Sequence, residues 1–150
     1  MQVPGWSGRA SAIALVGAAL VSFAAAAAHK PIVQRPLSAT PWAPVAPGAP
    51  ILGADGWTGP GGSYCAFARF PKGFSEPRHF HTNDLHVVVL DGEWGVWAPG
   101  APERFVTAGG YQFIPGGTEH LSRCGPTKDC IVYDCGPAAF DIQGLAPGKP

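Results

Sequence analysis

The chain has 150 residues, of which 13% are charged and 46% hydrophobic, with ten basic residues against ten acidic ones. A length near 150 favours one domain, and this hydrophobic content excludes a disordered chain. The 17 prolines and 21 glycines argue against a coiled coil or a helical bundle and favour short strands joined by turns. The balanced charge argues against nucleic-acid binding, which needs a clustered basic surface.

The first 28 residues have the pattern of a secretion signal. Arg9 gives a positively charged start, the run from 11 to 28 is largely apolar, and residues 24–28 are all alanine. Small residues of this kind precede a signal peptidase cleavage site, and an uncleaved membrane anchor is the alternative. We therefore expect residues 1–28 to be a cleaved signal peptide and the mature protein to be secreted or periplasmic, without membrane attachment after cleavage.

Residues 29–60 are rich in proline, alanine and glycine and follow no helix or strand period. They also contain Trp42 and Trp57, and tryptophan side chains are costly to leave in water. We predict an extended arm that packs these two side chains against the domain. A flexible linker is the alternative.

Short apolar or aromatic runs separated by glycine or proline fill residues 61–143. The predicted strands are 64–70, 86–90, 93–97, 104–106, 111–114, 119–124 and 130–134. Asp91-Gly92 predicts a tight hairpin between the second and third of these strands. Short strands at such spacing predict an all-β sandwich or barrel over 61–143, followed by a flexible C-terminal tail at 144–150.

Four cysteines, Cys65, Cys124, Cys130 and Cys135, follow the predicted signal peptide. An even number in an exported chain predicts two disulfides, for which three pairings exist. Cys124 and Cys130 flank a turn sequence at 125–129, so they could face each other across a hairpin, and Cys65 would then pair with Cys135. A four-thiolate zinc site is the alternative, but the chain lacks a C-x-x-C pair.

Histidines carry the candidate chemistry. His79 and His81 are two residues apart, so on a strand both side chains would project from the same face. His120 follows a later predicted strand that ends in a turn. Imidazole is the commonest metal ligand, and three imidazoles leave coordination positions open for water or a substrate.

Two motifs in this chain resemble those of the cupin superfamily, also called RmlC-like proteins. The first family motif is G-x5-H-x-H-x3,4-E-x6-G, and the matching residues here are Gly73, His79, His81, Leu85 and Gly92. The second is G-x5-P-x-G-x2-H-x3-N, and the matching residues here are Gly109, Pro115, Gly117, His120 and Cys124. The chain is most similar to small one-domain cupins of the ChrR-like kind and their relatives of unknown function. The resemblance implies a double-stranded β-helix, a jelly-roll-like barrel, with a divalent metal ion held by His79, His81 and His120.

The chain departs from the family pattern at two positions. Leu85 stands where the family has its glutamate ligand, and Cys124 stands where it has asparagine. Asp84 could replace the lost carboxylate if the strand begins late. His86 should point to the opposite face from the ligands, and we expect it to be a core or inter-sheet histidine.

A three-histidine site is compatible with several ions, namely Fe, Zn, Mn, Cu or Ni. The enzyme hypothesis is a small-molecule dioxygenase or related metal-dependent oxidoreductase, and the alternative is a non-catalytic cupin that binds or senses a small ligand, with or without metal. The candidates for a general acid, a general base or an anion anchor are Glu119, Arg78, Tyr111 and Arg69, each of which is also an ordinary surface or structural residue type. The resemblance further implies a homodimer formed through an edge strand.

Overall fold

The computed structural model describes residues 32–54 and 62–144. The chain divides into two units, Met1–Gln34 and Arg35–Pro150, and of the first only 32–34 are described. The predicted signal peptide, Trp57 and most of the predicted tail therefore lie outside the described residues. Within the described part of the chain, no helix is long and apolar enough to cross a membrane.

The second unit is built almost entirely from strands. It contains one short 3-10 turn, η1 (Leu37–Ala39), and eleven described strands. The strands are β1 (Ala43–Pro44), β2 (Leu52–Ala54), β3 (Tyr64–Phe70), β4 (Ser75–Phe80), β5 (Leu85–Asp91), β6 (Glu93–Trp97), β7 (Phe105–Thr107), β8 (Tyr111–Ile114), β9 (His120–Cys124), β10 (Cys130–Gly136) and β11 (Gln143–Gly144).

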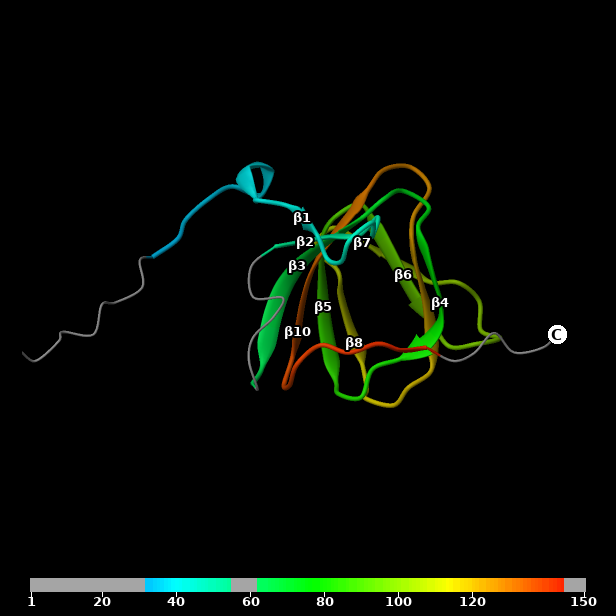
Figure 1. The fold of residues 1–150 in the computed structure, drawn as a ribbon. Helices are drawn as coiled ribbons and strands as arrows, with labels where there is room; N and C mark the ends of the chain where they lie inside the picture. The colour runs from blue at the N-terminus through cyan, green and yellow to red at the C-terminus, as the bar shows by residue number, and fades with distance from the viewer. Residues whose placement is uncertain (1–31, 55–61, 145–150) are drawn as a thin grey trace, which may run out of the picture. The chain divides into compact units, whose positions relative to one another are not determined.

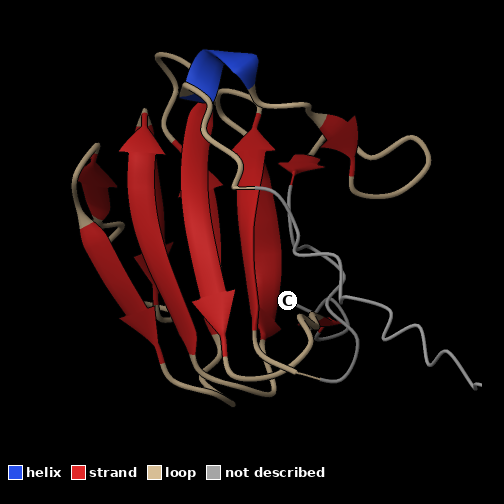
Figure 2. Ribbon diagram, turned by 90° about the vertical axis from the view of Figure 1, so that its left-hand side faces the viewer, coloured by secondary structure: helices blue, strands red, loops and turns tan. Residues whose placement is uncertain are grey.

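These strands form two antiparallel sheets that lie face to face as two layers (Figure 1). The larger sheet, seen face-on in Figure 2, has the order β1-β2-β3-β10-β5-β8, and the smaller sheet has the order β11-β4-β9-β6-β7. The predicted all-β, double-stranded β-helix fold is thereby confirmed. The described strands keep the two sheets separate, so the structure is an open jelly-roll sandwich rather than a closed barrel.

Alternating burial explains why the long strands of the larger sheet form. Every second residue is buried in β3, in β10 and in β5 from Leu85 to Val89, and the buried residues face the smaller sheet. The core gathers between the layers, where Phe70 stacks on Trp94 with ring centroids 4.2 Å apart. The smaller sheet covers the other side of this core, as expected for sheet-on-sheet packing.

Two predicted hairpins, at Asp91-Gly92 and at residues 125–129, are in fact crossings between the sheets. β5 pairs with β10 and β8, whereas β6 pairs with β9 and β7, so the hairpin predicted at Asp91-Gly92 is wrong. Gly92 has φ +75°, a left-handed conformation that turns the chain from one layer to the other. The sequence signal for a tight turn was real, but local turn residues do not say which strands pair.

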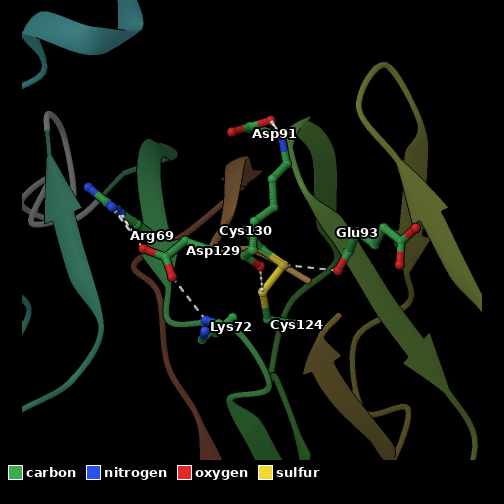
Figure 3. The surroundings of a disulfide bond; sticks show 8 residues. Arg69, Lys72, Asp91, Glu93, Cys124, Asp129 and Cys130 are labelled. Atoms are coloured by element: carbon green, nitrogen blue, oxygen red, sulfur yellow. Dashed lines mark hydrogen bonds and ion pairs between the residues drawn. A yellow bond between two sulfur atoms is a disulfide. The ribbon is translucent and has the colours of Figure 1, made fainter. Parts of the chain in front are cut away.

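Both predicted disulfides are present, Cys65–Cys135 and Cys124–Cys130, and they exclude a four-thiolate zinc site. Cys124 ends β9 and Cys130 begins β10, so this bond links the two sheets instead of closing a hairpin (Figure 3). The 125–129 turn is fastened by Asp129, which accepts hydrogen bonds from the Arg69 side chain and from the Lys72 backbone N–H. Cys65 and Cys135 lie directly opposite each other on β3 and β10.

The segment predicted as an extended arm contributes strands to the larger sheet. β2 pairs with β3, and β1 pairs with β2 at the sheet edge. Trp42 is half-buried in a groove that Arg69 and Ile131 also line. The exact boundary between arm and domain, placed at residue 60 from sequence, stays a prediction.

Candidate metal centre

The three predicted ligands converge at the end of the smaller sheet. His79 lies on β4 and His120 begins β9, and the two residues are direct partners in the antiparallel register. His81 lies just beyond the end of β4, two residues after His79. Strand pairing thus brings His120 beside histidines that are about forty positions earlier in the chain.

Backbone carbonyl groups fix the tautomer of all three rings. The Nδ1 atoms lie 2.7, 2.6 and 2.9 Å from the carbonyl oxygens of Pro77, Asp141 and Thr118, in the order His79, His81 and His120. A carbonyl oxygen can only accept, so each Nδ1 must carry the proton and donate it. In a neutral ring the lone pair then resides on Nε2, which is the tautomer that a metal ligand needs.

The cluster is compact and shielded from water. The three side chains are 2–6% exposed, and one ligand atom from each lies within 4.8 Å of the others. Burial lowers the pKa of His120 to about 4 and also lowers the pKa of His81, because a charged imidazolium is costly in an apolar environment. These two rings are therefore neutral at physiological pH and available to a cation.

The C-terminal segment (residues 137–144) covers one side of this cluster. It runs from β10 in the larger sheet to β4 in the smaller one, where β11 pairs with the strand of His79 (red in Figure 1). The Asp141 carbonyl holds the His81 ring, and the Asp141 side chain accepts hydrogen bonds from Thr82 and Gln143. The Phe140 ring packs 5.2 Å from the His81 ring. Sequence reasoning missed this segment because no motif marks residues so far from the histidines.

A cavity of about 170 Å³ lies between the sheets beside the cluster. His81 and His120 line it, together with apolar side chains from both layers. These apolar residues are Val45, Ile51, Phe70, Leu85, Val87, Trp94, Val96, Ile114, Val132, Phe140 and Ile142. An apolar cavity with a few polar groups at one side is typical of small-molecule sites.

The remaining polar lining residues are Glu76, Ser122 and Asp134. Asp134 lies on β10 in the larger sheet and is 5% exposed, and its Oδ1 atom has no hydrogen-bond partner. Burial and, to a smaller extent, the negative charge of Glu76 together raise the pKa of Asp134 to about 7. Burial and the nearby charge of Asp134 also raise the pKa of Tyr64. Asp134 was not singled out from sequence, since an aspartate within an apolar strand has no distinguishing spacing.

Leu85 occupies the position of the family's glutamate and is buried in the cavity wall. Asp84, the proposed substitute, is exposed and instead accepts a hydrogen bond from the Gly116 backbone N–H. The carboxylate that does approach the cluster is Glu76, whose Oε2 atom is 3.9 Å from His79 Nε2. Glu76 lies within the first motif, but at a position where the motif specifies no residue type.

The other candidates lie away from the cavity lining. His86 is exposed, so the expectation of a core or inter-sheet position is wrong, although strand alternation does turn it away from the cluster. Its Nδ1 atom is 2.7 Å from the Tyr111 hydroxyl, on the outer face of the larger sheet. Glu119 forms an exposed ion pair with Arg78, and Arg69 pairs with Asp129.

The donor set fits a divalent cation. His79 Nε2 is buried with no hydrogen-bond partner. A buried polar atom without a partner destabilises the fold, and a bound cation would offset this cost. Imidazole nitrogens suit zinc, iron, copper and nickel, so the donors alone do not select one ion. The group can hold a metal ion through His79, His81 and His120.

The two sheets and the placement of the histidines define a cupin-like fold, which solved RmlC-like cupin structures share. More narrowly, the chain belongs to the family described as a domain of unknown function, DUF4437, which matches residues 44–145. No curated protein matches the chain.

Several solved structures share this fold. The polyketide cyclase RemF from Streptomyces resistomycificus has 20% identity and a TM-score of 0.60, over 79% of this chain and 88% of that one. A protein of unknown function with a cupin-like fold from Ralstonia eutropha JMP134 has 23% identity and a TM-score of 0.60, over 75% and 77%. KdgF from Halomonas sp. has 20% identity and a TM-score of 0.51, over 64% and 86%. At these identities the likeness establishes the fold alone.

Proposed function

We propose that this protein is an exported, metal-dependent cupin that acts on a small molecule as a dioxygenase-type oxidoreductase. The observation that carries the proposal is the arrangement of three buried histidines, each with Nδ1 bound to a backbone carbonyl and Nε2 available. Such an arrangement holds an ion through three positions and leaves further positions open for a substrate. Bound iron would supply oxygen chemistry, and bound zinc would supply Lewis acidity.

The cavity supports a small and mainly apolar substrate with a polar end. Phe70, Trp94 and Ile114 offer apolar contact, whereas His81 and His120 lie at the polar side. A molecule placed there would direct its oxygen toward the histidines and bury its hydrocarbon part. Asp134 could hold a proton within the same space, because burial raises its pKa to about 7. RemF, a polyketide cyclase by name, is an enzyme on this fold and is consistent with such a substrate class.

A second candidate function is non-catalytic binding or sensing of a small ligand. The predominantly apolar lining favours it, because contacts with Val87, Val96 and Val132 retain a ligand without promoting a reaction. Oxygen uptake with a candidate substrate would favour the enzyme. Ligand binding that is unaffected by a chelator would favour the second candidate.

Export and dimerisation belong to the same proposal. Two disulfides are compatible with a secreted or periplasmic location, where they form and persist. Cleavage after residue 28 is checked by mass spectrometry of the mature N-terminus. A homodimer could form through an edge strand such as β8, and sedimentation measures it.

The deciding experiment is elemental mass spectrometry of the exported protein beside a variant with His79, His81 and His120 all changed to Ala. We expect near-stoichiometric metal in the wild type and its loss in the variant. Iron or copper would direct screening toward oxygen consumption, and zinc toward hydrolysis or binding. Failure of the wild type to bind any added divalent ion would contradict the metal-dependent function.

A further inference from the structure

We propose that Glu76 is a direct fourth protein ligand of the metal centre and replaces the carboxylate that the chain lacks at Leu85. This inference rests on the proposed metal-dependent function. Leu85 begins β5 in the larger sheet, whereas Glu76 lies on β4 in the smaller sheet, on the same strand as His79. The carboxylate would therefore reach the ion from the histidine side of the cavity rather than from the opposite wall.

A β-bulge in β4 turns Glu76 toward the histidines. Residues 76 and 79 are three apart, so a regular strand would place their side chains on opposite faces. The register with β9 shifts between these two residues, and both side chains point inward as a result. The bulge contains Pro77, whose carbonyl oxygen accepts the hydrogen bond from His79 Nδ1. One local irregularity thus orients both the carboxylate and the ring.

The distance between Glu76 and His79 suits a shared cation. Among the described residues, the group whose ligand atoms all lie within 4.8 Å of one another is His79, His81 and His120, so the Glu76 side chain would shift toward His81 and His120 when an ion binds. Glu76 Oε2 lies 3.9 Å from His79 Nε2, and that nitrogen is buried without a hydrogen-bond partner. Two ligand atoms that are each about 2.1 Å from one ion lie no more than about 4.2 Å apart. The Ser122 hydroxyl, directly opposite on β9, donates a hydrogen bond to Glu76 Oε2 and holds the carboxylate in the cavity.

Charge balance gives an independent reason for this role. Three neutral imidazoles leave a divalent ion with its full charge between mostly apolar walls, where an uncompensated charge is costly. A carboxylate ligand cancels half of that charge. The acidic residues that line the cavity are Glu76 and Asp134. Of these two, Glu76 lies on the strand of His79 and within 4 Å of its Nε2 atom, whereas Asp134 belongs to the opposite sheet.

The test compares Glu76→Gln with Glu119→Gln by calorimetric titration of the metal-free, disulfide-intact protein with Zn²⁺, and with Co²⁺ for its visible spectrum. Glutamine nearly matches glutamate in size, so far-ultraviolet circular dichroism should show both variants folded. Glu119 is the matched control, because it precedes His120 but is paired with Arg78 outside the cavity. We expect E76Q to bind at least 100-fold more weakly with an altered Co²⁺ spectrum, and E119Q to stay within threefold of wild type.

Three outcomes would overturn the proposal. Wild-type affinity and an unchanged Co²⁺ spectrum in E76Q would mean that Glu76 is not a ligand, while the three-histidine centre would stand. An equal loss of metal affinity in E76Q and E119Q would mean that the loss comes from long-range charge and not from a missing ligand. Absence of metal binding in the wild type itself would remove both this inference and the proposed function.

Discussion

His79 and His120 are direct cross-strand partners whose ring centroids lie 4.2 Å apart. This pairing joins the two cupin motifs at one place, since each motif supplies one of the two strands. Both rings are held in place by hydrogen bonds, because the Pro77 carbonyl accepts from His79 Nδ1 and the Thr118 carbonyl accepts from His120 Nδ1. The site is thus preorganised by the backbone, which lowers the conformational cost of binding an ion.

His120→Ala should remove metal-dependent stabilisation without unfolding the protein. We expect Zn²⁺ to raise the melting temperature of the wild type, because an ion that binds only the folded state stabilises it. The variant should lose at least about tenfold in affinity and most of this shift. Thermal unfolding with and without Zn²⁺ measures the effect. His86→Ala is the control, since His86 lies exposed on the outer face, and a similar loss in this control would argue against the assigned site.

The sequence predicted much of the fold because burial alternates strictly along the long strands. The predicted strands at 64–70, 93–97 and 111–114 match β3, β6 and β8. Strand pairing was less accessible, because Asp91-Gly92 signals a turn but not a change of sheet. The short strands β1, β2 and β11 depend on pairing with distant partners rather than on their own pattern.

In the candidate site, too, some residues could be predicted from sequence patterns, whereas others depend on how the strands pair and pack. His79, His81 and His120 could be selected because their spacing follows the family motifs. Glu76 was missed because a bulge reverses the face that alternation assigns to it. Asp134 was missed because its chemistry comes from burial, which only the packed sheets create.

Asp134→Asn should stabilise the fold above neutral pH. The pKa of Asp134 is raised from 3.8 to about 7, so the folded protein binds a proton that the unfolded chain has released. The stability that this bound proton contributes to the folded protein is therefore fully present below about pH 4. It is lost as the pH rises to about 7 and above. The variant should gain up to about 4 kcal/mol relative to wild type at pH 8, and little at pH 4.

Urea unfolding at several pH values between 4 and 8 checks this prediction. Glu119→Gln is the control, because an exposed ion pair contributes about 1 kcal/mol or less. A difference between D134N and wild type that does not change with pH would contradict the raised pKa of Asp134.

The two disulfides should differ in their access to a reductant. Cys124 and Cys130 are 0% exposed, whereas Cys65 is exposed on the outer face of the larger sheet. A thiolate must reach a sulfur atom to exchange with it, so limited dithiothreitol should reduce Cys65–Cys135 first. Alkylation followed by peptide mass spectrometry gives the order. Earlier labelling of Cys124 and Cys130 would indicate that the region around the Cys124–Cys130 bond opens before Cys65–Cys135 is attacked.

Gly92→Ala should destabilise the protein more than Gly100→Ala does. Both glycines have positive φ, +75° and +79°, so alanine is strained at either position by about 1 kcal/mol or more. A Cβ atom at Gly92 would also lie 2.6 Å from the Asp129 carbonyl oxygen, whereas one at Gly100 would meet no atom within 4 Å. The neighbouring backbone at 129–130 is fixed by the Cys124–Cys130 bond and by the hydrogen bonds of Asp129, so it cannot move away easily. Urea unfolding should give an additional loss of about 1–3 kcal/mol for G92A over G100A, and equal losses would mean that the crossing between the sheets adapts to the extra methyl group.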